Sequence, residues 1–224
     1  MLHDECKIRV DRIYEAAETA FVKAHLKPGD LFVDVGAHIG YYSVLASGLV
    51  GPRGRVFAFE PDPMNHAKLE DNTMPLGNVV AIHRAVSDFV GLANLHLSDS
   101  NSGDHRLFAV EGRRTEKVSV TSLDVWFPMQ KINFLKIDVQ GVEMSVLRGA
   151  EKLIARSPGL VGIVEFTPWL LRMAGVRPIE LPKWFIEHGF SLTVARSGIR
   201  VDPQQLEEFC KLKRHVNLLF QKKC

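Results

Sequence analysis

Short apolar runs alternate with segments of helical periodicity over most of the chain, and this alternation constrains the fold more than any other feature. The clearest runs are residues 31–35, 55–60 and 132–138. Continuous apolar runs of this length are typical of strands in a parallel sheet that helices cover on both faces. Because crossovers between parallel strands are right-handed, the pattern predicts an α/β fold with a doubly wound, mostly parallel sheet.

The 224 residues predict a single domain with two additions. Residues 1–27 have apolar positions at helical spacing and predict an N-terminal helical segment. Residues 91–126 interrupt the alternation, and we expect their two extended stretches, 92–97 and 117–125, to form an inserted hairpin over one end of the sheet. The other expected elements are strands at 79–86, 160–166, 190–196 and 215–221, and helices at 41–50, 63–72, 142–156, 180–188 and 203–211.

The composition excludes several classes of protein. An apolar fraction of 46% and a charged fraction of 24% are globular values and argue against a disordered chain. The formal net charge of +2 provides no strong field for a nucleic-acid backbone, so we expect no nucleic-acid partner. No apolar run reaches the roughly 18–20 residues that span a bilayer, and the charged N-terminus is not typical of a signal peptide. The widely spaced cysteines, Cys6, Cys210 and Cys224, predict free thiols in a cytoplasmic protein.

A glycine-containing loop, VDVGAHIG at residues 33–40, joins the first strand to a helix, as a cofactor-binding loop does. Asp34, Gly36 and Gly40 follow the pattern D-x-G-x-x-x-G, whereas a dinucleotide fingerprint requires G-x-G-x-x-G. A carboxylate at the first position opposes a pyrophosphate and suits a cation. Glu60 ends the second strand, where an acidic group can accept hydrogen bonds from ribose hydroxyls. The loop therefore favours S-adenosylmethionine over NAD, with a purely packing role for the glycines as the alternative.

The chain resembles FkbM-type methyltransferases over residues 25–170, in five segments that occur in family order: PGDLFVDVGAHIGYYS, GRVFAFEPDP, AVSD, TSLDVW and LKIDVQGVEMSVLRGAEKL. The resemblance implies the class I methyltransferase fold, with a seven-stranded sheet that has one antiparallel strand near its end. It also implies S-adenosylmethionine as the cofactor and, for most members, O-methylation of sugars and natural products.

Site residues follow from the resemblance by matched position. They are Asp34, Gly36, Ala37, His38 and Gly40 for the methionine end, Glu60 for the ribose, and Ser87 and Asp88 for the adenine edge. Asp138 lies in the matched LKIDVQG segment and belongs to the same implied cofactor site. Two residues depart from the family pattern: Gln140 stands where many relatives have Glu, and His38 stands where Asn is frequent.

Asp138 and Glu165 are each predicted to end a strand, and in a doubly wound sheet ligands bind beyond the carboxyl ends of the strands. The implied fold makes these two strands neighbours. Adjacent carboxylates can share a proton, flank a base or hold a divalent cation such as Mg²⁺, which would make a bound hydroxyl more acidic. The alternative for Glu165 is a salt-bridged strand end.

Residues 98–106 form a polar loop suited to act as a lid or to bind the acceptor. His105 is a candidate general base because histidine exchanges protons near neutral pH, with a solvated loop residue as the alternative. Trp169 suits either the wall of a sugar pocket or the core. A basic cluster suits a phosphate or carboxylate on the substrate, although a solvated loop is the simpler interpretation; its members are Arg106, Arg113, Arg114 and Lys117.

These features predict an S-adenosylmethionine-dependent O-methyltransferase that acts on a hydroxyl of a small acceptor, a sugar or glycoside. His105, Asp138 and Glu165 are the catalytic candidates, and Asp138 and Glu165 are also the candidate metal ligands. Two other classes stay open: a nicotinamide-dependent oxidoreductase and a non-catalytic cofactor-binding module. Methylation of a nucleic-acid base is disfavoured, because IDVQ stands where such enzymes commonly have an N/D-P-P-Y/F run. A homo-oligomer is compatible with the sequence.

Overall fold

The computed structural model describes residues 14–222, and its largest element is a seven-stranded sheet with the order β3-β2-β1-β7-β8-β10-β9. All neighbouring strands pair in parallel except that β10 runs antiparallel to both β8 and β9. The strands are β1 (Leu31–Val35), β2 (Arg55–Phe59), β3 (Val79–Ile82), β7 (Phe134–Ile137), β8 (Val161–Phe166), β9 (Phe190–Val194) and β10 (Val216–Lys222). The predicted doubly wound sheet, with its single antiparallel strand, is confirmed.

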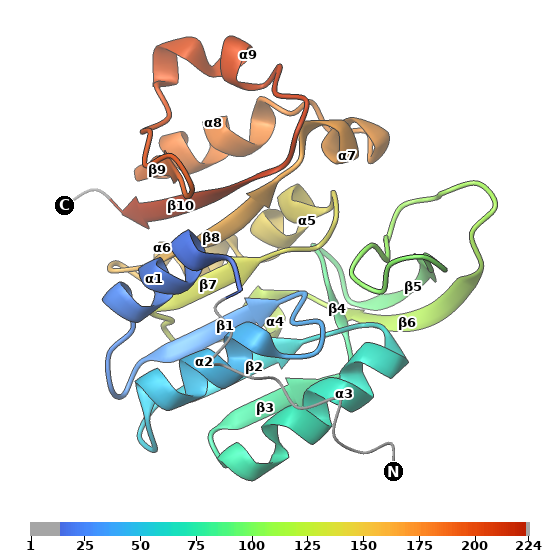
Figure 1. The fold of residues 1–224 in the computed structure, drawn as a ribbon, viewed down its shortest axis with the longest axis vertical. Helices are drawn as coiled ribbons and strands as arrows, with labels where there is room; N and C mark the ends of the chain where they lie inside the picture. The colour runs from blue at the N-terminus through green and yellow to red at the C-terminus, as the bar shows by residue number, and fades with distance from the viewer. Residues whose placement is uncertain (1–13, 223–224) are drawn as a thin grey trace.

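Helices cover both faces of this sheet (Figure 1). Successive residues of a strand point to opposite faces, so Phe32 and Phe134 pack under the first helices while Val33 and Leu135 belong to the core on the other side. One face carries α1 (Ala16–His25), α2 (Tyr41–Val50) and α3 (Pro63–Thr73). The other carries α4 (Leu123–Trp126), α5 (Glu143–Arg148), α6 (Glu151–Ala155) and α8 (Glu180–Glu187). Short helices complete the fold: α7 (Pro168–Met173), α9 (Leu206–Phe209), η1 (Met74–Leu76) and η2 (Pro203–Gln205).

The predicted insertion forms a second, three-stranded sheet of order β4-β6-β5. Its strands are β4 (Ala85–Val86), β5 (Gly91–His96) and β6 (Thr115–Thr121). β5 and β6 form the expected antiparallel hairpin, and β4 adds to it in parallel. Figure 1 shows this small sheet beside the large one, with a long loop between β5 and β6. The loop covers the carboxyl ends of the central strands, where the site described below lies.

At three places the structure ends or interrupts a predicted element early, and a local or tertiary contact marks each place. The strand expected at 79–86 stops at Ile82, and its last two residues pair with β6 instead. The strand expected at 117–125 stops at Thr121, because Ser122 begins α4 by accepting a hydrogen bond from the Val125 backbone. The helix expected at 142–156 is split at Gly149, where an added Cβ would lie 2.0 Å from the Ser87 carbonyl oxygen.

Some expectations concern residues outside the described range. Of the predicted helical segment 1–27, the structure describes only the part from residue 14, which contains α1. Cys210 is a buried free thiol, and Cys6 and Cys224 lie outside the described residues. Within residues 14–222, no helix is both long and apolar enough to cross a membrane.

Candidate active site

A cavity of about 1540 Å³ lies at the carboxyl ends of β1, β2, β7 and β8, under the loop between β5 and β6. The loop after β1, the first residue after β2, the residues after β7 and the end of β8 all contribute to its wall. Parallel sheets place ligands at these strand ends. Sites for one drug-sized ligand have volumes of about 300–1,000 Å³, so this cavity has room for two ligands side by side.

The β1–α2 loop turns sharply at the cavity wall and uses its own backbone donors. The N–H groups of Gly36 and Ala37 both donate to the Phe59 carbonyl oxygen at 3.0 Å, and that of Gly40 donates to Ala37 at 2.8 Å. Gly36 has a φ of +79°, and a Cβ at this position would lie 1.8 Å from the Asp138 carbonyl oxygen. Because the N–H groups of Gly36, Ala37 and Gly40 are already paired, the loop is not arranged as a phosphate cradle, in agreement with the missing dinucleotide fingerprint.

Several of the predicted cofactor residues lie outside the cavity wall. Asp34 is fully buried in β1, where Ser43 donates a hydrogen bond to it at 2.8 Å. Gly40 packs against α3, since a Cβ there would lie 2.7 Å from a Leu69 methyl group. Ser87 and Asp88 also lie outside the wall; their neighbours Ala85 and Val86 line it instead.

Glu60 is a buried carboxylate in the cavity wall. One oxygen accepts a hydrogen bond from the His38 backbone at 2.8 Å and the other accepts one from the Asp62 backbone at 3.0 Å. Burial raises the pKa of Glu60 to about 7, although the two backbone donors act in the opposite direction. Each carboxylate oxygen has two lone pairs, so each keeps the capacity for one further donor. Two hydroxyl groups of one ligand, as on a ribose, match that capacity.

Lys136 is a site residue that sequence reasoning missed. Its ammonium lies 3.7 Å from Asp34 Oδ1 and 3.4 Å from Asp138 Oδ2, and 5.2 Å above the Tyr42 ring centroid. Burial opposes its charge, but the carboxylates of Asp138 and Asp34 outweigh burial and raise the pKa of Lys136. The signal was a lysine inside an otherwise apolar central strand, where an unpaired charge is not tolerated.

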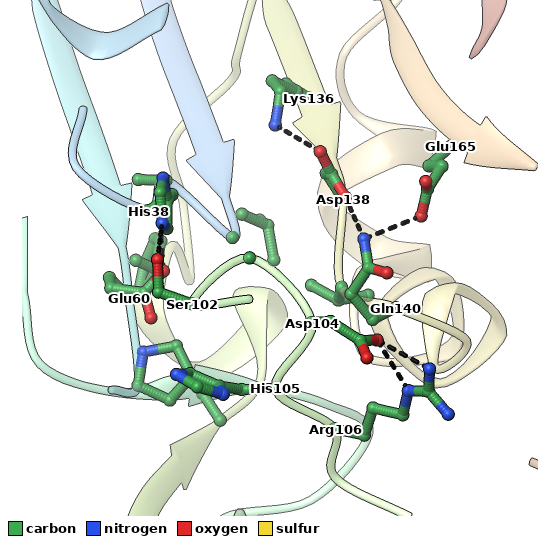
Figure 2. Close-up of a pocket in the computed structure, with 18 of the residues that line it drawn as sticks. His38, Glu60, Ser102, Asp104, His105, Arg106, Lys136, Asp138, Gln140 and Glu165 are labelled. Atoms are coloured by element: carbon green, nitrogen blue, oxygen red, sulfur yellow. Dashed lines mark hydrogen bonds and ion pairs between the residues drawn. The ribbon is translucent and has the colours of Figure 1, made fainter. Parts of the chain in front are cut away.

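Asp138 and Glu165 lie on opposite sides of one side-chain amide, as Figure 2 shows. Gln140 Nε2 donates to Asp138 Oδ1 at 2.9 Å and to Glu165 Oε2 at 3.0 Å. Burial raises the pKa of Glu165 well above its usual range, and the charges of Asp138 and Glu143 raise it further. The structure therefore brings the two predicted strand-end carboxylates together.

The carboxylates of this pair already have donors supplied by the protein. Mg²⁺ is usually held by one or two carboxylates and keeps several waters, so a site for it needs carboxylate oxygens that are free of other donors. Here Asp138 and Glu165 already accept hydrogen bonds from the Gln140 amide, and Asp138 also pairs with Lys136. Among residues 14–222, no group of three or more His, Cys, Asp or Glu side chains is arranged to hold a metal ion.

His105 lies away from the two carboxylates, on the side of the cavity that holds His38 and Glu60 (Figure 2). Its Nδ1 accepts a hydrogen bond from the Ser98 backbone at 3.0 Å, and its Nε2 lies 3.6 Å from Asp62 Oδ2. Both ring nitrogens therefore face groups of the protein. The structure does not bring His105 together with Asp138 and Glu165.

The β5–β6 loop spans the mouth of the cavity. At one end, the Ser102 backbone carbonyl accepts a hydrogen bond from the Asn65 side chain at 2.8 Å, and the Ser102 hydroxyl lies 3.0 Å from His38 Nε2. At the other end, the buried Arg106 lies 5.2 Å from the Trp169 ring centroid. Of the predicted basic cluster, Arg106 and Arg113 both pair with Asp104, so their charges hold the loop.

Backbone strain is concentrated at this cavity. Within the described residues, Glu15, His38 and Gln140 are the non-glycine residues with positive φ, at 46°, 52° and 56°. All three line the cavity, from three separate segments of the chain. Glu15 is held there by hydrogen bonds from the Tyr42 hydroxyl at 2.7 Å and from Asn217 at 3.1 Å. Strained conformations of this kind persist where the surrounding structure enforces them, which is typical of functional sites.

The chain is similar in sequence to a known methyltransferase family and to individual methyltransferases. Residues 34–192 match the family model of the methyltransferase FkbM domain. The chain is 30% identical over 170 residues to hexuronic acid methyltransferase AglP of Haloferax volcanii, covering 75% of this chain and 66% of AglP. It is 25% identical over 151 residues to 2-O-methyltransferase NoeI of Sinorhizobium fredii, covering 58% of this chain and 61% of NoeI. The match thus spans less than two thirds of the length of either relative.

A solved structure has a similar fold. It is a SAM-dependent O-methyltransferase of Thermotoga maritima, with a TM-score of 0.55 over 97% of this chain and 67% of that chain, at 16% identity.

Proposed function

This chain belongs to the FkbM methyltransferase family, and from that premise we propose that it transfers a methyl group from S-adenosylmethionine to a hydroxyl of a sugar or glycoside. The observation that carries the proposal is one cavity with two chemically different ends. One end has a buried carboxylate suited to a ribose, and the other has the Asp138–Gln140–Glu165 group. Membership of a methyltransferase family sets aside the nicotinamide oxidoreductase.

Glu60 supports the cofactor end of the proposal. Its two oxygens are fixed by the backbone of His38 and Asp62, so the free lone pairs have a defined direction. The cofactor, when bound, supplies an electrophilic methyl group: the acceptor oxygen bonds to the methyl carbon, the carbon–sulfur bond breaks and its electron pair stays on sulfur. The protein's own contribution is to hold the acceptor in line and to remove its proton.

Glu165 is the residue that we assign to proton removal. An ordinary carboxylate is too weak a base for a sugar hydroxyl, but burial and two neighbouring carboxylates raise the pKa of Glu165. In the ionised form it would accept the hydroxyl proton as the new carbon–oxygen bond forms. Asp138, whose carboxylate Lys136 holds, would orient the acceptor. His105 is assigned to the loop that closes the cavity, because both its ring nitrogens face protein groups.

The sugar class rests on the relatives' names and on Trp169. AglP is named for a hexuronic acid and NoeI for 2-O-methylation. In this chain Trp169 lines the cavity and is 44% exposed, so part of its ring is free to pack against a sugar. Aromatic rings offer large, rigid apolar faces for such contacts.

The test is methyl transfer from labelled S-adenosylmethionine to matched methyl glycosides, uronides, phenols and peptides, with mass spectrometry of the products. We expect singly O-methylated glycosides. Glu165→Gln should lower kcat by about 10²–10⁴-fold, the range of a general base, while the Kd of S-adenosylhomocysteine stays unchanged. Transfer only to nitrogen or only to peptides would refute the proposal.

A further inference from the structure

The amide of Gln140 joins two carboxylates of the site. Its single nitrogen donates to Asp138 Oδ1 at 2.9 Å and to Glu165 Oε2 at 3.0 Å, so both of its hydrogens are used. Figure 2 shows the amide between the two acidic side chains, with Lys136 on the far side of Asp138. The two carboxylates thus have three contacts with donors: two from the Gln140 amide and one from the Lys136 ammonium.

Two carboxylates that accept from one amide nitrogen repel each other when both are ionised. Proteins relieve such repulsion with a shared proton or with a bound cation. Here the positive charge comes from Lys136, which also lies 3.7 Å from Asp34, its register partner on β1. The bridging hydrogens come from Gln140. Lys136 thus supplies positive charge to Asp138 from its far side, and Gln140 alone supplies the bridge between the two carboxylates.

The backbone holds Gln140 in place for this contact. Its φ is +56°, and the next residue, Gly141, has a φ of +107°. The Gly141 N–H donates at 2.9 Å to Glu143, which is itself buried. A Cβ on Gly141 would lie 2.9 Å from Phe108 and 3.1 Å from the Leu170 carbonyl oxygen, so the turn is closely packed. A strained turn braced on several sides indicates that the direction of the Gln140 side chain matters.

We propose that Gln140 and Lys136 are positioning residues that take the place of a divalent cation between Asp138 and Glu165, so that methyl transfer needs no metal ion. This inference rests on the proposed function, because it concerns the same two carboxylates. One part can be tested without turnover: the Gln140 amide occupies the carboxylate oxygens that Mg²⁺ would need, and a carboxylate at position 140 would let Mg²⁺ bind.

The first experiment measures Mg²⁺ binding by calorimetry to the full chain loaded with S-adenosylhomocysteine. Wild type should show no binding at the pair. Gln140→Glu should bind Mg²⁺, because three carboxylates then converge on one point. Binding to wild type that Asp138→Asn weakens would overturn the proposal, and so would a Gln140→Glu variant that stays inert to Mg²⁺. This measurement needs no turnover, so it decides the inference even if no acceptor is methylated and the proposed function fails.

The second experiment measures kinetics with and without a chelator. Wild type and the exposed control Gln204→Met should keep their kcat within twofold in chelator. Gln140→Met, which keeps the size but removes the donor, should lose at least tenfold in kcat under both conditions with little change in the acceptor KM. Gln140→Glu should lose activity in chelator and regain it with Mg²⁺. A chelator-sensitive wild type, or a Gln140→Met variant with normal kcat, would refute the inference.

Lys136 needs a paired variant, because removing it alone leaves the buried charge of Asp34 without a neighbouring cation. Asp34→Asn/Lys136→Met removes both charges of the buried pair, and the exposed Lys152→Met is the control. We expect the double variant to lose at least tenfold in kcat, with an acceptor KM near that of wild type. An unchanged kcat in a folded double variant would show that Lys136 does not position Asp138.

Discussion

Replacing Glu60 by glutamine tests the cofactor end of the site most directly. Two backbone N–H groups and, in the proposed complex, two ribose hydroxyls share its two carboxylate oxygens. Glutamine keeps one accepting oxygen and loses the charge. A hydrogen bond to a charged group contributes about 1.5–3 kcal/mol, so losing one hydroxyl contact should raise the Kd of S-adenosylhomocysteine about 10- to 150-fold.

The same change also affects the free protein, and the two effects must be separated. One of the backbone donors, on His38 or Asp62, loses its acceptor in the Glu60→Gln variant. A buried donor without a partner costs about 1–3 kcal/mol of stability, which should lower the Tm by several degrees. Calorimetric titration with S-adenosylhomocysteine well below that Tm measures the change in Kd apart from the loss of stability, with the exposed Glu207→Gln as the control.

The pH dependence of binding provides an independent check. Burial raises the pKa of Glu60 to about 7, so the group is largely protonated at pH 6 and ionised at pH 8. Only the ionised form can accept from both hydroxyls, so wild-type affinity should rise with pH across this window, and that of Glu60→Gln should stay flat. Equal Kd values for variant and wild type at pH 8 would refute the assignment and place the ribose elsewhere.

Two further variants probe the glycine loop and the acceptor wall. Gly36→Ala should lower the Tm and abolish S-adenosylhomocysteine binding, because its Cβ would lie 1.8 Å from the Asp138 carbonyl oxygen. The control is Gly189→Ala at a solvent-facing position, which also has positive φ but open space around it, so it measures the cost of the backbone conformation without a clash. Equal losses of Tm in the two variants would contradict the reasoning. Trp169→Ala should raise the glycoside KM about tenfold without changing the Kd of the cofactor product, as expected for a lost aromatic contact of about 1 kcal/mol or more. An unchanged KM would show that Trp169 does not contact the acceptor.

The fold could be predicted largely from local pattern. Continuous apolar strands such as β1 and β7, separated by amphipathic helices, are compatible with little except a parallel sheet covered on both faces. The interrupted alternation likewise predicted the hairpin of β5 and β6. Where the local pattern failed, tertiary contacts explain the difference. The chain leaves β3 at Ile82 to join β6, and the helix breaks at Gly149, whose carbonyl oxygen accepts from the Asp124 backbone while the Asp124 carboxylate caps the next helix.

The sequence predicted which residues lie at the site better than it predicted which of them contact one another. The sequence alone predicted that Glu60, Asp138 and Glu165 would lie at the strand ends, because a carboxylate after an apolar strand marks that edge of the sheet. Which side chains meet there depends on strand register and on turn geometry. Asp34 pairs with Lys136 because β1 and β7 align them, and Gln140 reaches both carboxylates because its backbone adopts positive φ. His105 faces Asp62 because the β5–β6 loop folds back over α3. Periodicity along a chain determines which residues are buried, but distances between segments far apart in sequence arise only when the whole core packs.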